Sequence, residues 1–133
     1  MKYKLIAQEH PMGCAIASTA SLLESSYKKT LRLFDKSYTS TRGYYLKDII
    51  WALKKRGFNY KYSKVTNKTK RYLEIPGSIV FIRRSKKYPA GHYLLKIKNG
   101  WMNHWINYPE INPTKAGVNK KLPGKAQWVL YKR

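Results

Sequence analysis

The sequence predicts an α+β fold in which N-terminal helices pack on an antiparallel β-sheet. Apolar residues recur at helical spacing in the first half of the chain, whereas alternating or β-branched stretches dominate the second half. The dipeptide Asn99-Gly100 between two of these stretches is a strong hairpin signal, because the central positions of a tight turn favour positive φ. Helices followed by hairpin-linked strands indicate an α+β rather than a doubly wound architecture.

Two helices are expected in the first half. Over residues 14–27 the apolar positions recur with helical spacing, and Gly13 gives the turning approach to a helix that begins at or near Cys14. Residues 28–43, with the polar stretch SYTSTRG, are expected to form a loop. The stretch LKDIIWALKKRGF starting at Leu46 has one apolar face, cations in its last turn and a glycine stop at Gly57.

Five strands are expected in the second half. Their β-branched, aromatic and alternating residues cover the segments 58–65, 78–84, 91–98, 101–107 and 126–132. A proline- and glycine-containing loop is expected between the last two strands. A chain of 133 residues fits a single domain spanning 1–133.

The charge is strongly unbalanced. Lys and Arg number 28 against six acidic residues, which gives a formal net charge of +22. Such a surface attracts polyanions, so we expect an anionic partner, either nucleic acid or an acidic protein assembly. A virion or nucleoprotein component fits this charge, although the composition also allows lysines that are simply solvated.

Several classes of protein do not fit the sequence. One cysteine excludes an intramolecular disulfide. No apolar stretch approaches the length of a membrane span, and the segment MKYKLIAQEH lacks the apolar region of a signal peptide, so a cytoplasmic or virion location is expected. The dispersed His residues have no zinc-ligand spacing, and no glycine-rich phosphate loop occurs, so no metal or cofactor is expected.

The lone cysteine lies where a reactive thiol could form. Unpaired N–H groups and the helix dipole at a helix start stabilise a thiolate, and Cys14 lies in the first turn of the first predicted helix. Gly13 allows a substrate carbonyl to approach the backbone closely. Gln8 lies six residues upstream, where its amide could donate to an oxyanion together with the backbone N–H of Cys14.

Three histidines compete for the role of base. His10 lies on the loop before Cys14, His104 lies inside a predicted strand, and His92 opens a strand after a turn at residues 89–91. We favour His92, because a strand start facing a helix N-terminus resembles the arrangement that papain-like enzymes use. No aspartate follows it in the chain, so Asn107 at the end of the paired strand is the candidate to accept the Nδ1–H bond of the imidazole.

The order of these motifs resembles the C39-like peptidases, a group of papain-like cysteine peptidases. The resemblance covers residue 8 to about residue 110 and rests on Gln8-x5-Cys14, the helix from Leu46 to Gly57, the strand in Ile75–Val80, Gly91-His92-Tyr93 and Ile106–Pro109. It implies a papain-like fold, a peptide or protein substrate, and a cysteine peptidase or related acyl-transfer activity. The implied roles are Cys14 as nucleophile, His92 as base, Asn107 as orienting residue and Gln8 as oxyanion donor.

The sequence departs from the family pattern at three positions. The family has Asp before the nucleophile and Gly after it, where this chain has Gly13 and Ala15, and Asn107 stands where the family has Asp. These departures leave open a catalytically silent scaffold that acts through its basic surface.

Overall fold

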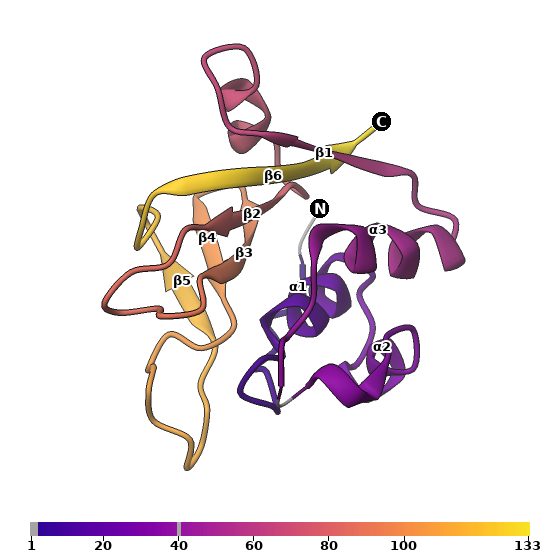
Figure 1. Ribbon diagram of the computed structural model, residues 1–133, viewed down its shortest axis with the longest axis vertical. Helices are drawn as coiled ribbons and strands as arrows, with labels where there is room; N and C mark the ends of the chain where they lie inside the picture. Colours follow the sequence, from indigo (N-terminus) through magenta and orange to yellow (C-terminus); the bar gives the residue numbers. More distant parts are fainter. Residues whose placement is uncertain (1–2, 40) are drawn as a thin grey trace.

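The computed structural model describes residues 3–39 and 41–133. Met1, Lys2 and Ser40, which the domain prediction 1–133 includes, lie outside these described residues. The α-helices lie on one side of an antiparallel sheet (Figure 1), so the predicted α+β class is confirmed. The helices are α1 (Cys14–Leu22), α2 (Tyr27–Leu31), α3 (Leu46–Lys55) and the short 3-10 turns η1 (Lys36–Tyr38) and η2 (Lys70–Glu74).

The described residues form a six-stranded sheet with the order β1-β6-β2-β3-β4-β5. Its strands are β1 (Tyr60–Lys64), β2 (Ile79–Ile82), β3 (His92–Ile97), β4 (Gly100–Asn103), β5 (Gly117–Asn119) and β6 (Ala126–Lys132). The last strand in the sequence, β6, pairs with both β1 and β2, so the C-terminal segment lies between them and β1 is an edge strand.

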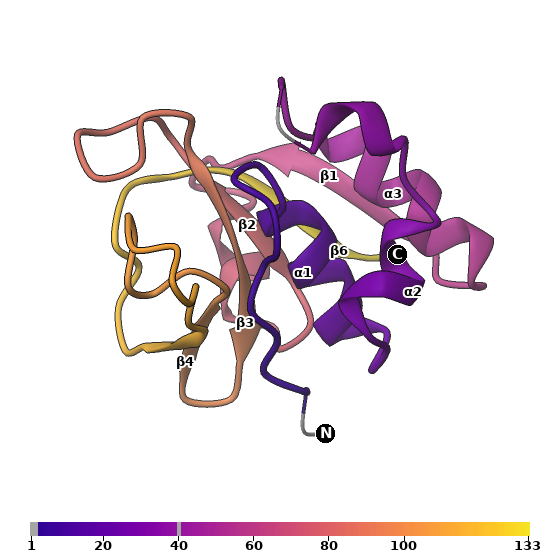
Figure 2. The ribbon, with the colours of Figure 1, turned by 90° about the horizontal axis from the view of Figure 1, so that it is seen from below.

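Helix α1 is the centre of the core. It lies between β3 on one side and α2 and α3 on the other (Figure 2). Ala15, Ile16, Ala17 and Ala20 are completely buried, and the small alanines allow the helix to approach the sheet closely. Because α1 is covered on nearly all sides, it shows a weak helical pattern in the sequence.

Helix α3 follows its predicted bounds. The Asp48 carboxylate accepts a hydrogen bond from the backbone N–H of Tyr45 (2.8 Å) and thereby caps the helix start. Gly57 follows the helix end with a φ of +82°, a conformation that glycine adopts without strain. Ile49 and Leu53 are fully buried against the core, as the apolar face predicts.

Five local predictions were wrong, among them the loop over 28–43, which contains most of α2 and all of η1. The predicted helix over 14–27 ends at Leu22, where Glu24 takes a positive φ of 53° and the Ser26 side chain caps a separate helix by accepting from Lys29 N. The predicted strand over 101–107 ends at Asn103, and the predicted loop that follows contains β5. The hairpin exists, but its turn lies at Lys98-Asn99, since Gly100 already pairs with Ile97.

No helix within residues 3–39 and 41–133 combines the length and apolar character needed to cross a membrane. The cytoplasmic or virion location stays a prediction.

Candidate active site

Cys14 and His92 line one cavity of about 220 Å³. Cys14 is the first residue of α1 and His92 the first residue of β3, and α1 packs along β3. The segment that leads into α1 runs beside β3 (Figure 2), and the hydrogen bond from Gln8 N to His104 O (3.1 Å) ties it to the chain beyond β4. The fold thus brings together the two residues that the sequence paired.

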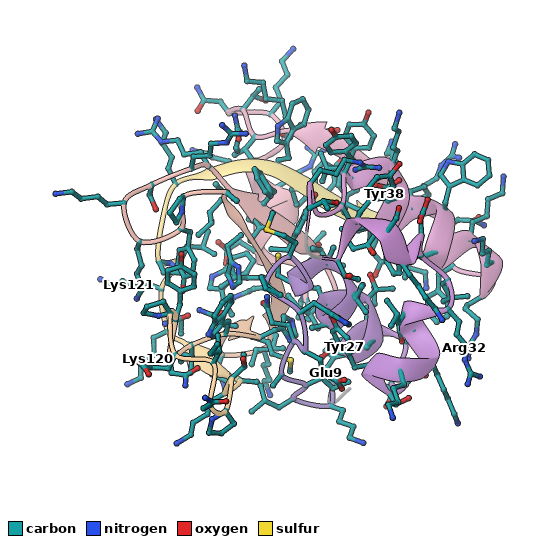
Figure 3. All side chains as sticks on the ribbon, turned by 60° about the horizontal axis from the view of Figure 1, so that its bottom comes forward. Glu9, Tyr27, Arg32, Tyr38, Lys120 and Lys121 are labelled. Atoms are coloured by element: carbon teal, nitrogen blue, oxygen red, sulfur yellow. The ribbon has the colours of Figure 1, made fainter. Side chains whose placement is uncertain are left out.

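The residue before Cys14 must be small. A Cβ atom at Gly13 would overlap with the hydroxyl of Tyr27, which shares a hydrogen bond of 2.9 Å with His10 Nδ1. As long as Tyr27, labelled in Figure 3, keeps its position, residue 13 therefore has no room for the Asp that the family pattern has there. Gly13 also provides no side-chain cap, so the first N–H groups of α1 stay available near the sulfur.

Burial opposes ionisation of the thiol. Cys14 keeps part of its surface open to the cavity, but desolvation of the sulfur raises its pKa to about 11. Backbone N–H groups of Tyr93, Ala15 and Cys14 itself lower the pKa and offset part of that effect. The free protein therefore holds a thiol whose proton must be taken by a base before or during attack.

The imidazole of His92 is buried and held on two sides. His92 is 3% exposed, and its ring stacks on that of Tyr88 with a centroid distance of 4.4 Å and an interplanar angle of 5°. Gly91 before it has a φ of +76°, and a Cβ atom there would overlap with the Phe81 ring. Glycine at this position lets β3 start with the His92 side chain directed into the cavity.

Asn103 fixes the tautomer of His92. Its Oδ1 accepts from the backbone N–H of Trp105 (3.0 Å), which can only donate, so the amide orientation is determined. The same Oδ1 accepts from His92 Nε2 (2.8 Å), which must then carry the proton. The Asn103 Nδ2 donates to the hydroxyl of Tyr88 (3.0 Å) and to Asn119 Oδ1 (2.9 Å), so all four hydrogen-bonding positions of the amide are used.

The neutral form of this imidazole dominates. Desolvation lowers the pKa of His92 to about 4, the bond to Asn103 raises it, and the positive charge of Lys87 lowers it further. With Nε2 protonated, the lone pair of neutral His92 is on Nδ1. A neutral thiol and a neutral base with a fixed lone pair therefore face the same cavity.

The predicted orienting residue Asn107 is not the partner of His92. Its Oδ1 accepts from Lys115 N (2.8 Å) and its Nδ2 donates to Pro113 O (3.0 Å), so it holds together the loop that leads to β5. The error follows from β4, which ends at Asn103 rather than at residue 107. The predicted nitrogen was also wrong, because the bond is made by Nε2 and not by Nδ1 of the imidazole.

Gln8 is buried behind the loop that precedes Cys14. Its Nε2 donates to the carbonyl oxygens of His10 (2.9 Å) and Pro11 (3.2 Å), which uses both amide hydrogens. The amide shapes the loop that carries Gly13 and Cys14. Gln8 is not one of the described residues that line the 220 Å³ cavity, and its role as an oxyanion donor stays a prediction.

The two other histidines, His10 and His104, make contacts that support the fold and do not line the cavity. His10 is half-buried and bonds to Tyr27. His104 is completely buried, and its Nδ1–H donates to Ile6 O (2.7 Å) while its Nε2 has no hydrogen-bond partner within the described part of the chain. Tyr88 and Asn103 contact His92 directly, but the sequence analysis did not identify them as site residues. Only their nearness in the sequence to His92 and to the Asn-Gly turn could have indicated them.

The buried histidines make folding sensitive to acid. Desolvation lowers the pKa of His104 from 6.5 to about 4, as it does for His92. Below pH 6.5 these histidines are protonated in the unfolded chain but stay neutral in the folded chain, so protonation favours unfolding. The contribution of each histidine to the free energy of unfolding is fully present above pH 6.5 and falls by about 3 kcal/mol as the pH falls toward 4.

We therefore expect the free energy of unfolding, measured with urea at several pH values, to fall steeply between pH 7 and pH 4.5. In His104→Asn the amide nitrogen replaces Nδ1–H as donor to Ile6 O but does not titrate, so the decline should be about half as large. An unchanged decline in this variant would show that His104 does not contribute to it.

The comparisons with known proteins agree with this geometry. The sequence matches the peptidase C39 family over residues 2–120. The chain belongs to the peptidase C39 family. The C39-type, papain-like fold is also that of the peptidase domain of Streptococcus ComA, which is described as a bi-functional ABC transporter involved in a quorum-sensing pathway. The two structures align with a TM-score of 0.62 and 20% sequence identity, over 97% of this chain and 96% of that chain.

A second similar structure is the peptidase domain of Streptococcus mutans ComA. It aligns with a TM-score of 0.55 and 20% identity, covering 98% of this chain and 99% of that chain. Among curated protein sequences none matches this chain significantly. The family assignment therefore rests on the sequence match, and the two structures show the shared fold.

Proposed function

We propose that this chain, acting as one domain over residues 1–133, is a cysteine peptidase that cleaves a peptide or protein substrate with Cys14 as nucleophile and His92 as base. One observation carries the proposal. The imidazole that shares a cavity with the only thiol has its proton held on Nε2 by Asn103, which leaves Nδ1 as the proton acceptor. Asn103 therefore replaces Asn107 as the orienting residue of the proposed triad.

The proposed reaction proceeds through an acyl-enzyme. Nδ1 of His92 takes the thiol proton as the sulfur of Cys14 attacks the substrate carbonyl, and the resulting imidazolium is stabilised by Asn103. The imidazolium then protonates the leaving amine, and the peptide bond breaks. A water molecule, deprotonated by Nδ1, attacks the thioester and releases the acid. Deamidation and isopeptide cleavage would follow the same steps.

The developing oxyanion needs donors that exist before the reaction. The backbone N–H of Cys14, at the first position of α1, has no acceptor within the helix and is the first proposed donor. Gln8 is the second, and it would have to exchange its longer bond to Pro11 O (3.2 Å) for the oxyanion. This exchange would couple substrate binding to a small movement of the loop before Cys14.

The test is a search for cleavage products. The protein is incubated with a mixture of unfolded proteins, and new N-termini are identified by mass spectrometry. We expect new termini with the wild-type protein and none with Cys14→Ala, which removes the nucleophile and leaves the fold intact. Equal products from both proteins would assign them to a contaminant, and no products from either would contradict the proposed activity.

A second candidate function is polyanion binding by a silent scaffold, as part of a virion or nucleoprotein. The rings of Tyr72 and Tyr131 stack at 3.7 Å with an interplanar angle of 1°, and Arg71 and Lys61 lie over their faces. The exposed cations Lys61 and Arg71 beside this stack, on a chain of charge +22, favour binding to phosphates. This function would survive Cys14→Ala unchanged, which separates it from the proposed peptidase.

A further inference from the structure

We infer that a groove beside the catalytic cavity binds an acidic stretch of the polypeptide substrate, an inference that rests on the proposed peptidase function. The basic groove, as we call it, has a volume of about 710 Å³ and lies between the start of α3 and the strands β1, β2 and β6. Its cationic lining residues are Arg42, Lys47, Arg83 and Arg84.

The basic groove is continuous with the cavity that contains the thiol. Arg42, Tyr44, Ala90 and Tyr93 line both of them. A polypeptide whose scissile bond lies at Cys14 can therefore extend directly into the groove. Its volume is within the range of about 300–1,000 Å³ that is typical of ligand pockets, so the groove can hold several side chains.

The cations of the groove lack protein counter-charges. Of the four, only Arg42 is in an ion pair, with Asp48 at 3.3 Å, while Lys47, Arg83 and Arg84 are exposed and form no ion pair with any residue that the structure describes. Among the described residues that line the groove, none is acidic. Because the chain has only six acidic residues, we expect the counter-charges of these cations to come from a ligand with several carboxylates.

The remaining walls favour peptide over single-stranded nucleic acid. Tyr62 packs edge-on against Trp128 with an interplanar angle of 67°, and Phe81 is tilted by 57° against Tyr93. These aromatic walls offer apolar surface to aliphatic side chains, and the groove continues into the cavity of the proposed peptidase, which a polypeptide substrate has to cross. We therefore assign the groove to a segment in which acidic and apolar residues alternate.

The probe for this inference is a fluorescein-labelled peptide of alternating Glu and Leu, compared with a matched peptide in which every Glu is Gln. Binding is measured by fluorescence anisotropy with Cys14→Ala at low salt. The Glu peptide should bind about tenfold more tightly than the Gln peptide, and R83Q/R84Q should remove most of that preference.

The matched control is K120Q/K121Q, which makes the same change in charge at two exposed lysines that do not line the groove. Figure 3 shows both lysines on the side of the molecule opposite to Tyr38. This variant should keep the preference for Glu. If both double variants weaken binding equally, the preference reflects net charge alone and the inference is wrong.

A second measurement links the groove to the thiol. In the wild-type protein the Glu peptide should slow the alkylation of Cys14 by iodoacetamide about tenfold at saturation, because the same chain crosses the cavity, and R83Q/R84Q should abolish this protection. If the Glu peptide binds through Arg83 and Arg84 but does not slow the alkylation of Cys14, the inference is wrong. Tighter binding of a thymidine oligonucleotide than of the Glu peptide through Arg83 and Arg84 would also overturn it.

These results separate the two proposals. A peptidase without preference for the Glu peptide keeps the proposed function and rejects the acidic substrate. Specific binding and protection without any cleavage keeps the groove and rejects the peptidase.

Discussion

Replacing His92 with alanine should reduce the rate of peptide hydrolysis by about 10²–10⁴-fold, because no other described residue that lines the cavity carries an imidazole or carboxylate to accept the thiol proton. The pKa of Cys14, raised to about 11 by burial, makes this loss large, since the thiolate fraction at neutral pH is small without a base. The alkylation of Cys14 by iodoacetamide, followed by mass spectrometry, should slow in the same variant.

The control for this prediction is His10→Ala. His10 is four residues from the nucleophile in the sequence, but its imidazole bonds to Tyr27 rather than lining the cavity. We expect hydrolysis by His10→Ala to fall less than about tenfold, since only the support of the loop is lost. Equal losses in the two variants would remove His92 from its proposed role, and alkylation that is insensitive to His92→Ala would do the same.

The sequence was informative where local physics determines the structure. The bounds of α3 follow from its apolar face, its terminal cations and Gly57, and β6 was predicted residue for residue in a segment rich in β-branched and aromatic residues. Cys14 at a helix start and His92 at a strand start could be placed in the same way, because each lies directly at a change of backbone conformation. That they share a cavity depended on the resemblance to a known family as well as on the pattern.

The sequence was less informative where side chains interrupt the regular backbone. The segment after β4 is rich in aromatic residues and reads as a continuous strand, but Asn103 Oδ1 accepts from Trp105 N at 3.0 Å and the chain turns there. A polar residue that ends a strand in this way cannot be recognised from alternation. The same side chain is the partner of His92, so one missed turn caused both the wrong strand end and the wrong orienting residue.

The second prediction with a large effect concerns Asn103. In Asn103→Leu the donors His92 Nε2–H and Trp105 N–H lose their acceptor inside the core, which costs about 1–3 kcal/mol for each group. The proton of His92 is then no longer held on Nε2, so we expect hydrolysis to fall by up to about 10⁴-fold, the loss that follows when the third member of a triad no longer selects the histidine tautomer.

Asn103→Asp should behave differently, because a carboxylate keeps the acceptor and adds a charge. Tyr88 can turn its hydroxyl to donate, and the Asn119 amide can rotate to present its nitrogen, so each contact of residue 103 can be kept. The negative charge stabilises the imidazolium and should raise the pKa of His92 above its present value of about 4. In turn, the imidazolium should lower the pKa of Cys14 from about 11.

Two spectroscopic titrations test this difference directly. The imidazole signals of His92, followed by NMR, should titrate at higher pH in Asn103→Asp than in the wild-type protein, and the ultraviolet absorbance of the thiolate should appear at lower pH. Since the imidazolium then persists to higher pH, the variant should hold more of the thiolate–imidazolium pair and retain more activity than Asn103→Leu. If neither titration moves in Asn103→Asp, and the hydrolysis of Asn103→Leu falls only in proportion to its loss of folded protein, Asn103 is a purely structural residue.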